Sequence, residues 1–406
     1  MAVLPKIHIA LPVMNEGELL QTCLDCIVQQ TLKPESIVIC VNQPDNWWEN
    51  PLKKDICLNN CKTLEFLIQC KNPVIKIIDR TSKGNGWKGK QTGVGWARKM
   101  AMDFISDEAN ENDIMISMDA DTVFGRNYFY TVSELFKNSG LAGLSNPYYH
   151  NLTGKEAEDR AILRYEIYMR NYSINLLLIH SPYAFTALGS AMACKVSAFR
   201  AIGGITPKLS GEDFYFLQKL KKYGKIGITN NQKVYPAARF SDRVFFGTGP
   251  AMIKGNAGDW SSYPIYHHSL FDKIKSTYYL FPLLFKEDKE TPMTHFLQQQ
   301  FNSAELWSPL RKNFITNENF IRACHEKIDG LRILQYMKQE QAKNNKPDAV
   351  CLKENLKYFS SIMKRYAATA TQDDFCFNDC SIPLLDEIRN YLVSVETELQ
   401  GAIVFL

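Results

Sequence analysis

Residues 113–122 read Asp113-Ile-Met-Ile-Ser-Met-Asp119-Ala-Asp121-Thr122. The apolar residues predict a short buried strand, and Asp119 and Asp121 follow where that strand ends. Two ionised carboxylates this close would repel each other if removed from water, and a hard divalent cation that also carries phosphate oxygens would offset the repulsion. An ordinary acidic turn is the alternative, because Asp favours turns and helix starts. The stretch therefore indicates a candidate cation site at the end of a strand.

The chain before this stretch alternates strand and helix patterns. A strand-like run covers 7–13, and an amphipathic helix begins near Asn15. Residues 36–41 form a nearly continuous apolar run, which is typical of a parallel strand buried on both faces. We expect an irregular region from 42 to 73 and a third strand at 74–78. This order predicts a β-α-β unit and an α/β fold.

Two loops carry basic residues that could meet an anion. The glycine-rich loop 81–90 holds three lysines and precedes a predicted helix over 91–107. Glycines let backbone N–H groups approach an anion, and a helix start with lysines favours phosphate. No Walker motif is present, and a solvated basic loop is the alternative. The second loop, 239–249, contains Arg239 and Arg243 and is interpreted as a segment able to fold over an anionic ligand.

A second pair of acids, Glu212 and Asp213, follows Gly211 at the start of a predicted helix. Acids at a helix start often only cap N–H groups and interact favourably with the helix dipole. Their pairing with the acids at 119 and 121 favours chemistry over capping. From about Ser269 onward the strand patterns stop, and we expect a helical region.

Composition narrows the class of protein. The chain has 406 residues, of which 45% are hydrophobic and 22% charged, with a formal net charge of +4. This length suggests two domains, or one large domain with an appendage. No long basic run with interleaved aromatic residues occurs, so nucleic acid is not an expected partner.

Leader, membrane and cysteine patterns point to one compartment. The sequence shows no secretory leader, so we expect a cytoplasmic protein. It also shows no apolar run long enough to span a bilayer, so we expect no integral membrane segment. Peripheral association with a membrane is left open. Eleven scattered cysteines fit a reducing compartment. Cys23 and Cys26 are interpreted as free thiols on a helix rather than a zinc site.

Four motifs, taken in order, resemble family 2 glycosyltransferases of the GT-A fold. They are Leu11-Pro12-Val13-Met14-Asn15-Glu16, Ala97-Arg98, Asp119-Ala-Asp121 and Gly211-Glu212-Asp213. The resemblance covers about residues 5–250. It implies a Rossmann-like mixed sheet flanked by helices, the fold of nucleotide-diphospho-sugar transferases. We expect this catalytic domain at 1–265 and a mainly helical C-terminal extension at 266–406.

The same resemblance assigns roles to individual residues. Asp213 matches the base that activates the acceptor, and Glu212 matches its neighbour. Asp121, with Asp119, matches the acids that hold Mg²⁺ or Mn²⁺ on the diphosphate, and His267 or His268 is a candidate third metal ligand. The residues expected to bind the nucleotide sugar are Pro12, Val13, Asn15, Glu16, Arg98, Asp119, Asp121 and, from its basic loop, Arg243.

These roles predict a metal-dependent, inverting glycosyltransferase of the hexosyltransferase type. Displacing a nucleoside diphosphate from a sugar needs charge neutralisation on the leaving group and removal of a proton from the incoming hydroxyl. The expected donor is a UDP or GDP sugar, and the acceptor is a glycan, a lipid-linked molecule or a small molecule. Many members of this family carry an acid directly after the second strand, and that acid contacts the nucleobase of the donor. This chain has Asn42 and Gln43 there, so the sequence does not identify the nucleobase. A sugar nucleotidyltransferase and an inactive sugar-nucleotide-binding protein are the alternatives.

Overall fold

The computed structural model describes residues 4–208, 211–229, 231–241, 247–343, 346–364 and 375–402. Contacts divide the chain into two compact units. The first contains residues up to Ile162 together with Phe185–Asp259, and the second contains Leu163–Ala184 and Trp260–Ala402. The division expected from the sequence, at residue 265, would assign 163–184 to the first domain, whereas these residues pack with the second unit.

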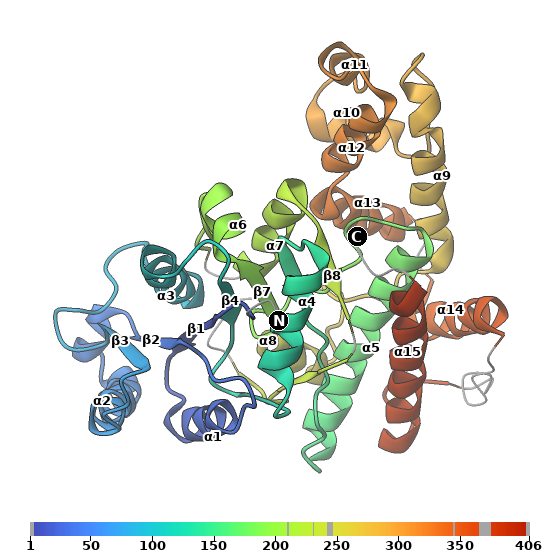
Figure 1. The fold of residues 1–406 in the computed structure, drawn as a ribbon. Helices are drawn as coiled ribbons and strands as arrows, with labels where there is room; N and C mark the ends of the chain where they lie inside the picture. The colour runs from blue at the N-terminus through green and yellow to red at the C-terminus, as the bar shows by residue number, and fades with distance from the viewer. Residues whose placement is uncertain are drawn as a thin grey trace. The chain divides into compact units, whose positions relative to one another are not determined.

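The first unit is built on a seven-stranded mixed sheet with the strand order β3-β2-β1-β4-β7-β6-β8 (Figure 1). Strands β3, β2, β1 and β4 are parallel neighbours, whereas β7 runs antiparallel to both β4 and β6. The strands are β1 (Ile7–Val13), β2 (Ser36–Asn42), β3 (Ile75–Arg80), β4 (Ile114–Ser117), β6 (Gly143–Ser145), β7 (Met192–Lys195) and β8 (Ile226–Ile228).

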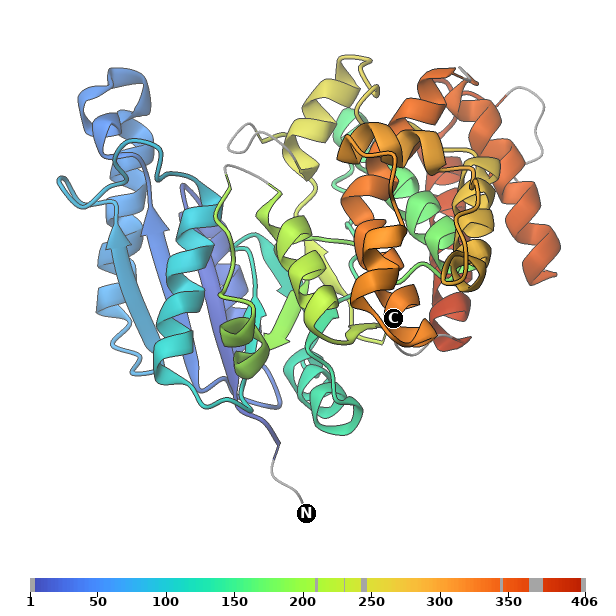
Figure 2. The same ribbon diagram turned by 90° about the horizontal axis from the view of Figure 1, so that it is seen from above.

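Helices cover both faces of this sheet. The helices of the unit are α1 (Gly17–Val28), α2 (Lys54–Gln69), α3 (Val94–Glu108), α4 (Tyr128–Ser139), α6 (Val196–Ala201), α7 (Glu212–Tyr223) and α8 (Thr248–Asn256). Figure 1 shows α3 on one side of the parallel strands and α1 and α2 on the other, and Figure 2 shows α3 running alongside the strands. Because both faces are covered, β1 is buried along its whole length.

Alternate strand residues face α3. Ala10, Val38 and Met115 lie in one apolar cluster with Ala97 and Met102 of that helix. Side chains alternate between the faces of a strand, so the neighbours of these strand residues point toward the opposite layer. The expected fold class, a mixed sheet flanked by helices, is confirmed.

The prediction of an irregular region from 42 to 73 is wrong. The segment contains two short 3₁₀ helices, η1 (Asp45–Glu49) and η2 (Pro51–Lys53), followed by the helix α2. The buried face of α2 combines apolar Leu64 and Leu67 with polar Asn60 and Thr63. These polar positions interrupt the apolar periodicity by which a helix is recognised in a sequence.

A small second sheet lies beside the end of β4. Strand β5 (Thr122–Phe124) pairs antiparallel with β9 (Val234–Pro236), and Thr122 lies opposite Pro236. The N–H group of Ala237 donates to the backbone oxygen of Asp121 at 3.1 Å. This pairing carries the segment after β9 to the acidic stretch, although more than a hundred residues separate them in sequence.

The second unit is helical, which confirms the expected helical C-terminal region. Helix α5 (Glu156–Leu178) begins in the first unit, and its residues from Leu163 pack with the second. The other helices are α9 (His268–Leu284), α10 (Thr294–Phe301), α11 (Ser308–Asn313), α12 (Asn317–Lys327), α13 (Gly330–Lys343), α14 (Asp348–Met363) and α15 (Ile382–Ala402). Across the ranges that the structure describes, no helix is long and apolar enough to cross a lipid bilayer.

Candidate active site

Asp119 and Asp121 lie just beyond the last residue of β4, and their side chains face away from the core. Met118 and Ala120 are fully buried, whereas the side chain of Asp119 is 34% exposed and that of Asp121 is 15% exposed. The sheet thus buries the apolar residues of the stretch and leaves the two carboxylates at the carboxyl end of a central strand. Ligands of open α/β sheets bind at this end of the strands.

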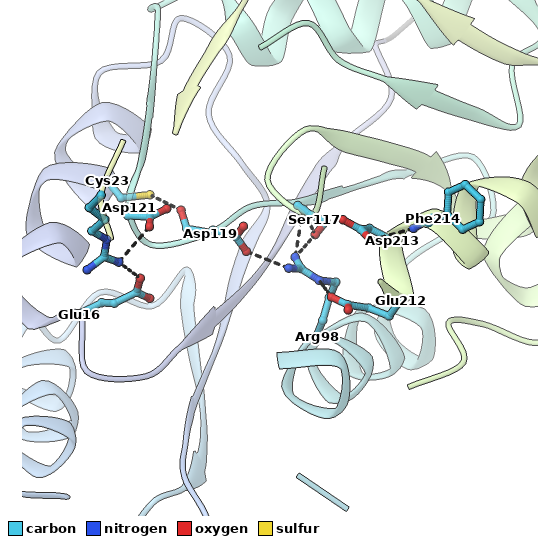
Figure 3. Close-up of polar contacts among 11 residues, drawn as sticks. Glu16, Cys23, Arg98, Ser117, Asp119, Asp121, Glu212, Asp213 and Phe214 are labelled. Atoms are coloured by element: carbon cyan, nitrogen blue, oxygen red, sulfur yellow. Dashed lines mark hydrogen bonds and ion pairs between the residues drawn. The ribbon is translucent and has the colours of Figure 1, made fainter. Parts of the chain in front are cut away.

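Arg98 of α3 connects Asp119 with Glu212 (Figure 3). Its Nη2 donates to Asp119 Oδ1 at 2.8 Å, and its Nε donates to Glu212 Oε1 at 3.1 Å. The guanidinium is 2% exposed, as expected for a buried cation that two carboxylates neutralise. Burial lowers the pKa of Arg98, but the charges of Asp119 and Glu212 outweigh that effect and raise it overall. One buried cation therefore holds together the two acidic motifs that the sequence singled out.

The backbone leaves room for this guanidinium at Gly189. Arg98 Nη1 donates to Gly189 O at 3.0 Å and also bonds Ser117 Oγ, which itself donates to Gly189 O at 2.6 Å. A Cβ atom at position 189 would lie 2.4 Å from Arg98 Nη2. The glycine is needed because the backbone approaches the charged group closely.

Glu16 and Asp121 share a second cation, Arg239. Its Nη2 donates to Glu16 Oε1 at 2.6 Å and to Asp121 Oδ2 at 2.9 Å. Glu16 reaches this position because Asn15 adopts a left-handed backbone conformation with φ of 56°. The N–H group of Asn15 donates to Asn60 Oδ1 at 2.7 Å, which holds this conformation in place. The carboxyl ends of β1 and β4 thus each contribute one acid to the same guanidinium.

Asp213 begins α7 beside Glu212, and the local structure changes its acidity. Its Oδ1 accepts a hydrogen bond from the N–H group of Phe214 at 2.8 Å (Figure 3). Burial, and next the charge of Glu212, raise the pKa of Asp213 to about 7, against the opposing effect of Arg98. A carboxylate with a pKa near neutrality suits general-base chemistry, because it is available to accept a proton near pH 7 and holds it more strongly than an ordinary Asp.

The end of β2 carries neutral amides in place of an acid. Asn42 Nδ2 donates to Val13 O at 2.9 Å, and Asn42 Oδ1 accepts from Trp87 Nε1 at 3.0 Å. Gln43 Oε1 accepts from Asn60 Nδ2 at 2.8 Å. These amides hold the ends of β1 and β2 to their surroundings, and they also fix the glycine-rich loop through Trp87.

The glycine-rich loop is anchored while its lysines face solvent. Gly84 N–H donates to Asp45 Oδ1 at 2.7 Å, and a Cβ atom at Gly86 would lie 2.6 Å from the Cα atom of Asp45. Lys83, Lys88 and Lys90 are all exposed. Their proposed contact with phosphate stays a prediction.

For the remaining expected site residues, contact with a ligand stays a prediction. Arg243 lies outside the described residues. His267 belongs to the second unit, where its Nε2 is 2.7 Å from Glu354 Oε2 and its Nδ1 accepts from the N–H group of Ser269 at 3.2 Å. To bind a metal through Nε2, His267 would have to release Glu354. Pro12 and Val13 end β1 beside Asn15, and contact of any of the three with a nucleotide stays a prediction.

The acids at the end of β4 fit a cation that a diphosphate helps to hold. Within the ranges covered by the structure, no group of three or more His, Cys, Asp or Glu residues is placed to bind a metal alone. Mg²⁺, however, is commonly bound by one or two carboxylates together with substrate phosphates. Asp119 and Asp121 supply such hard oxygen ligands, with Asp119 about one-third exposed.

Sequence reasoning missed Arg239, Ser117 and Gly189 as parts of this site. The loop after β9 contains two arginines, and the sequence analysis assigned Arg243 to the nucleotide. The β5–β9 pairing places the other arginine, Arg239, in contact with Asp121. The sequence Ala-Leu-Gly-Ser-Ala-Met-Ala-Cys at 187–194 is small and apolar, which is typical of a backbone that lies close to a ligand or another strand. The partner in that approach, Arg98, lies far away in sequence.

Comparisons with known proteins found similarity in structure but none in sequence. No family model matches the chain, and no curated protein matches it. Among solved structures, the chain is similar to S. aureus TarS 1-349 in complex with UDP-GlcNAc, with a TM-score of 0.42, 12% identity, and coverage of 84% of this chain and 92% of that one. It is also similar to GalNAc-T7 with UDP, GalNAc and Mn²⁺, with a TM-score of 0.38, 13% identity, and coverage of 85% and 58%. A third is the mannosyltransferase PcManGT from Pyrobaculum calidifontis in complex with GDP-Man and Mn²⁺, with a TM-score of 0.36, 12% identity, and coverage of 99% and 88%.

Proposed function

We propose that this chain is a glycosyltransferase that moves a sugar, of the hexose type, from a nucleoside-diphosphate donor to an acceptor hydroxyl with inversion. One observation carries the proposal: Arg98 holds Asp119, a candidate ligand of the donor's metal, and Glu212, the neighbour of a candidate base, in a single buried ion cluster. A sugar transfer needs both functions near one reacting carbon.

Asp213 is proposed as the base. With a pKa of about 7 it is partly ionised near neutral pH and can accept the proton of an acceptor hydroxyl as that oxygen attacks the sugar. Arg98 binds the adjacent Glu212, and the N–H group of Phe214 donates to the carboxylate of Asp213. A base on the face of the sugar opposite the leaving group implies a single displacement with inversion, as in inverting glycosidases.

Asp121 and Asp119 are proposed to hold Mg²⁺ or Mn²⁺ together with the diphosphate of a UDP or GDP sugar. Such a cation stabilises the charge that develops on the leaving phosphate. Glu16, at the end of β1, would lie beside the nucleoside, and the exposed lysines of the glycine-rich loop supply further positive charge. The acceptor is proposed to be a glycan, a lipid-linked molecule or a small molecule, and the location to be the cytoplasm with peripheral membrane association open.

A ligand-binding screen tests the proposal before any acceptor is known. Thermal unfolding is followed with UDP, GDP, CDP, dTDP and ADP, each with and without Mn²⁺. We expect one or two of them to raise the unfolding temperature, only with Mn²⁺, because a ligand that binds the folded chain alone stabilises it. Asp121→Asn should abolish the shift, whereas Arg126→Gln, at an exposed residue after β5, should leave it unchanged. A screen with no metal-dependent shift would contradict the proposal.

A further inference from the structure

Arg239 occupies the place of a bound cation between Glu16 and Asp121. Its Nη2 atom contacts both acids, at 2.6 Å from Glu16 Oε1 and 2.9 Å from Asp121 Oδ2. The side chains of Glu16 and Asp121 are 6% and 15% exposed, so the pair is poorly hydrated. Two carboxylates in such surroundings need a positive charge, and in the chain without ligands Arg239 supplies it.

The fit of this guanidinium to the described residues is incomplete. Arg239 Nε is buried, and within the described ranges of the chain it has no hydrogen-bond partner. Arginine binds a carboxylate best through two parallel N–H groups, and a buried donor left without a partner is destabilising. By contrast, every guanidinium nitrogen of Arg98 donates to the protein. Arg98 is therefore a fixed structural cation, whereas Arg239 is held mainly by charge.

The backbone beside Arg239 is held by hydrogen bonds, whereas its side chain can turn toward solvent. The bond from Ala237 N–H to Asp121 O and the β5–β9 pairing keep residue 239 near the acids. Its side chain is 29% exposed, so the guanidinium can turn toward solvent without unfolding the sheet. A diphosphate bound beside Asp121 would present oxygens with which the guanidinium of Arg239 could form a bidentate contact.

We propose that Arg239 is the internal counter-cation of Glu16 and Asp121, that it excludes divalent metal when no nucleotide is bound, and that it moves to the diphosphate when metal and nucleotide bind together. The inference rests on the proposed function for its nucleotide step, but not for its metal step. A metal ion at Asp121 Oδ2 and a guanidinium on the same oxygen would repel each other, so one must give way. Arg239 would thereby couple metal binding to the arrival of the donor.

The test measures Mn²⁺ affinity without nucleotide, by electron paramagnetic resonance of free Mn²⁺, in the wild-type chain and in Arg239→Gln. Removing the competing charge should tighten Mn²⁺ binding roughly 10- to 100-fold, the scale set by two partly buried ion pairs. Arg239→Lys keeps a cation and should bind Mn²⁺ about as the wild type does. Arg239→Gln combined with Asp121→Asn should lose the gain, and Arg126→Gln serves as the matched arginine control.

A second experiment measures the affinity of the same variants for UDP and GDP in saturating Mn²⁺. Here we expect Arg239→Gln to lower the affinity, whereas it should raise the affinity for free Mn²⁺. Arg239→Gln should weaken nucleotide binding about tenfold, because a charge-assisted contact to phosphate is lost. A merely structural arginine would weaken both metal and nucleotide binding, and that result would overturn the inference, as would unchanged Mn²⁺ affinity in Arg239→Gln. If Arg239→Gln binds Mn²⁺ more tightly but the wild type binds no nucleotide, the counter-cation role stands and the proposed function fails.

Discussion

Replacing Asp213 by Asn should stabilise the chain, and increasingly so as the pH rises. The pKa of Asp213 is raised from 3.8 to about 7 by folding, so the folded chain binds more protons than the unfolded chain between these values. Stability contributed by the neutral acid is therefore present at low pH and lost as the pH rises toward 7. Asn is a neutral substitute, and its Oδ1 can still accept the bond from the Phe214 N–H group.

The magnitude follows from the two pKa values. Each pKa unit corresponds to about 1.4 kcal/mol, so the variant should be more stable than the wild type by up to about 4 kcal/mol well above pH 7. Between about pH 5 and pH 8 the difference should widen by about 3 kcal/mol, or roughly 6–12 °C in unfolding temperature.

The assay is thermal unfolding of both proteins across this pH range, with Asp103→Asn as a control. Asp103 pairs with Lys99 on the surface at 2.7 Å, with a side chain 41% exposed, and its replacement should change stability by well under about 1 kcal/mol at every pH. Parallel pH profiles for the wild type and Asp213→Asn would refute the reasoning, because they would mean that folding does not perturb this carboxyl group.

Three further substitutions test the rest of the site. Arg98→Met should lower the free energy of unfolding by about 3–5 kcal/mol in urea or thermal unfolding, because Asp119 and Glu212 would lose their buried cation; a loss below about 1 kcal/mol would show that the cluster contributes little. Gly189→Ala should cost about 1–3 kcal/mol by the same measurement, since its Cβ atom would lie 2.4 Å from Arg98 Nη2, and a neutral result would mean that the guanidinium moves freely. Asp121→Asn should abolish Mn²⁺-dependent binding of UDP or GDP in calorimetry, and an unchanged titration would remove Asp121 from the metal site.

The sheet was predictable from the sequence because its strands are unusually clear. Residues 7–13 are apolar apart from His8, and residues 36–41 are apolar apart from Ser36; burial on both faces of the sheet favours such runs. Helix α2 was missed because Asn60 and Thr63 lie on its buried face, where they bond to neighbouring groups rather than pack in an apolar stripe. A periodicity argument recognises apolar burial and does not recognise buried hydrogen bonds.

The acids of the site were predictable, but their counter-charges were not. Asp119, Asp121, Glu212 and Asp213 stand at strand and helix ends, where local patterns expose them. Arg98 bonds Glu212 across 114 positions, and no local pattern reports such a partner. The choice of arginine after β9 likewise depends on strand register, which the sequence alone does not specify.

Sugar transfer with Asp213 as the base is tested by incubating the wild-type chain and Asp213→Asn with UDP and GDP sugars and Mn²⁺ and measuring the nucleoside diphosphate released. Water can replace the unknown acceptor in this reaction, at a lower rate. We expect release that requires Mn²⁺ and is specific for the nucleobase of the donor. In Asp213→Asn the release should fall by about 10²- to 10⁴-fold while donor affinity is kept, as expected for loss of a general base. Equal release by the two proteins, or release only of a nucleoside triphosphate when pyrophosphate is added, would contradict this expectation.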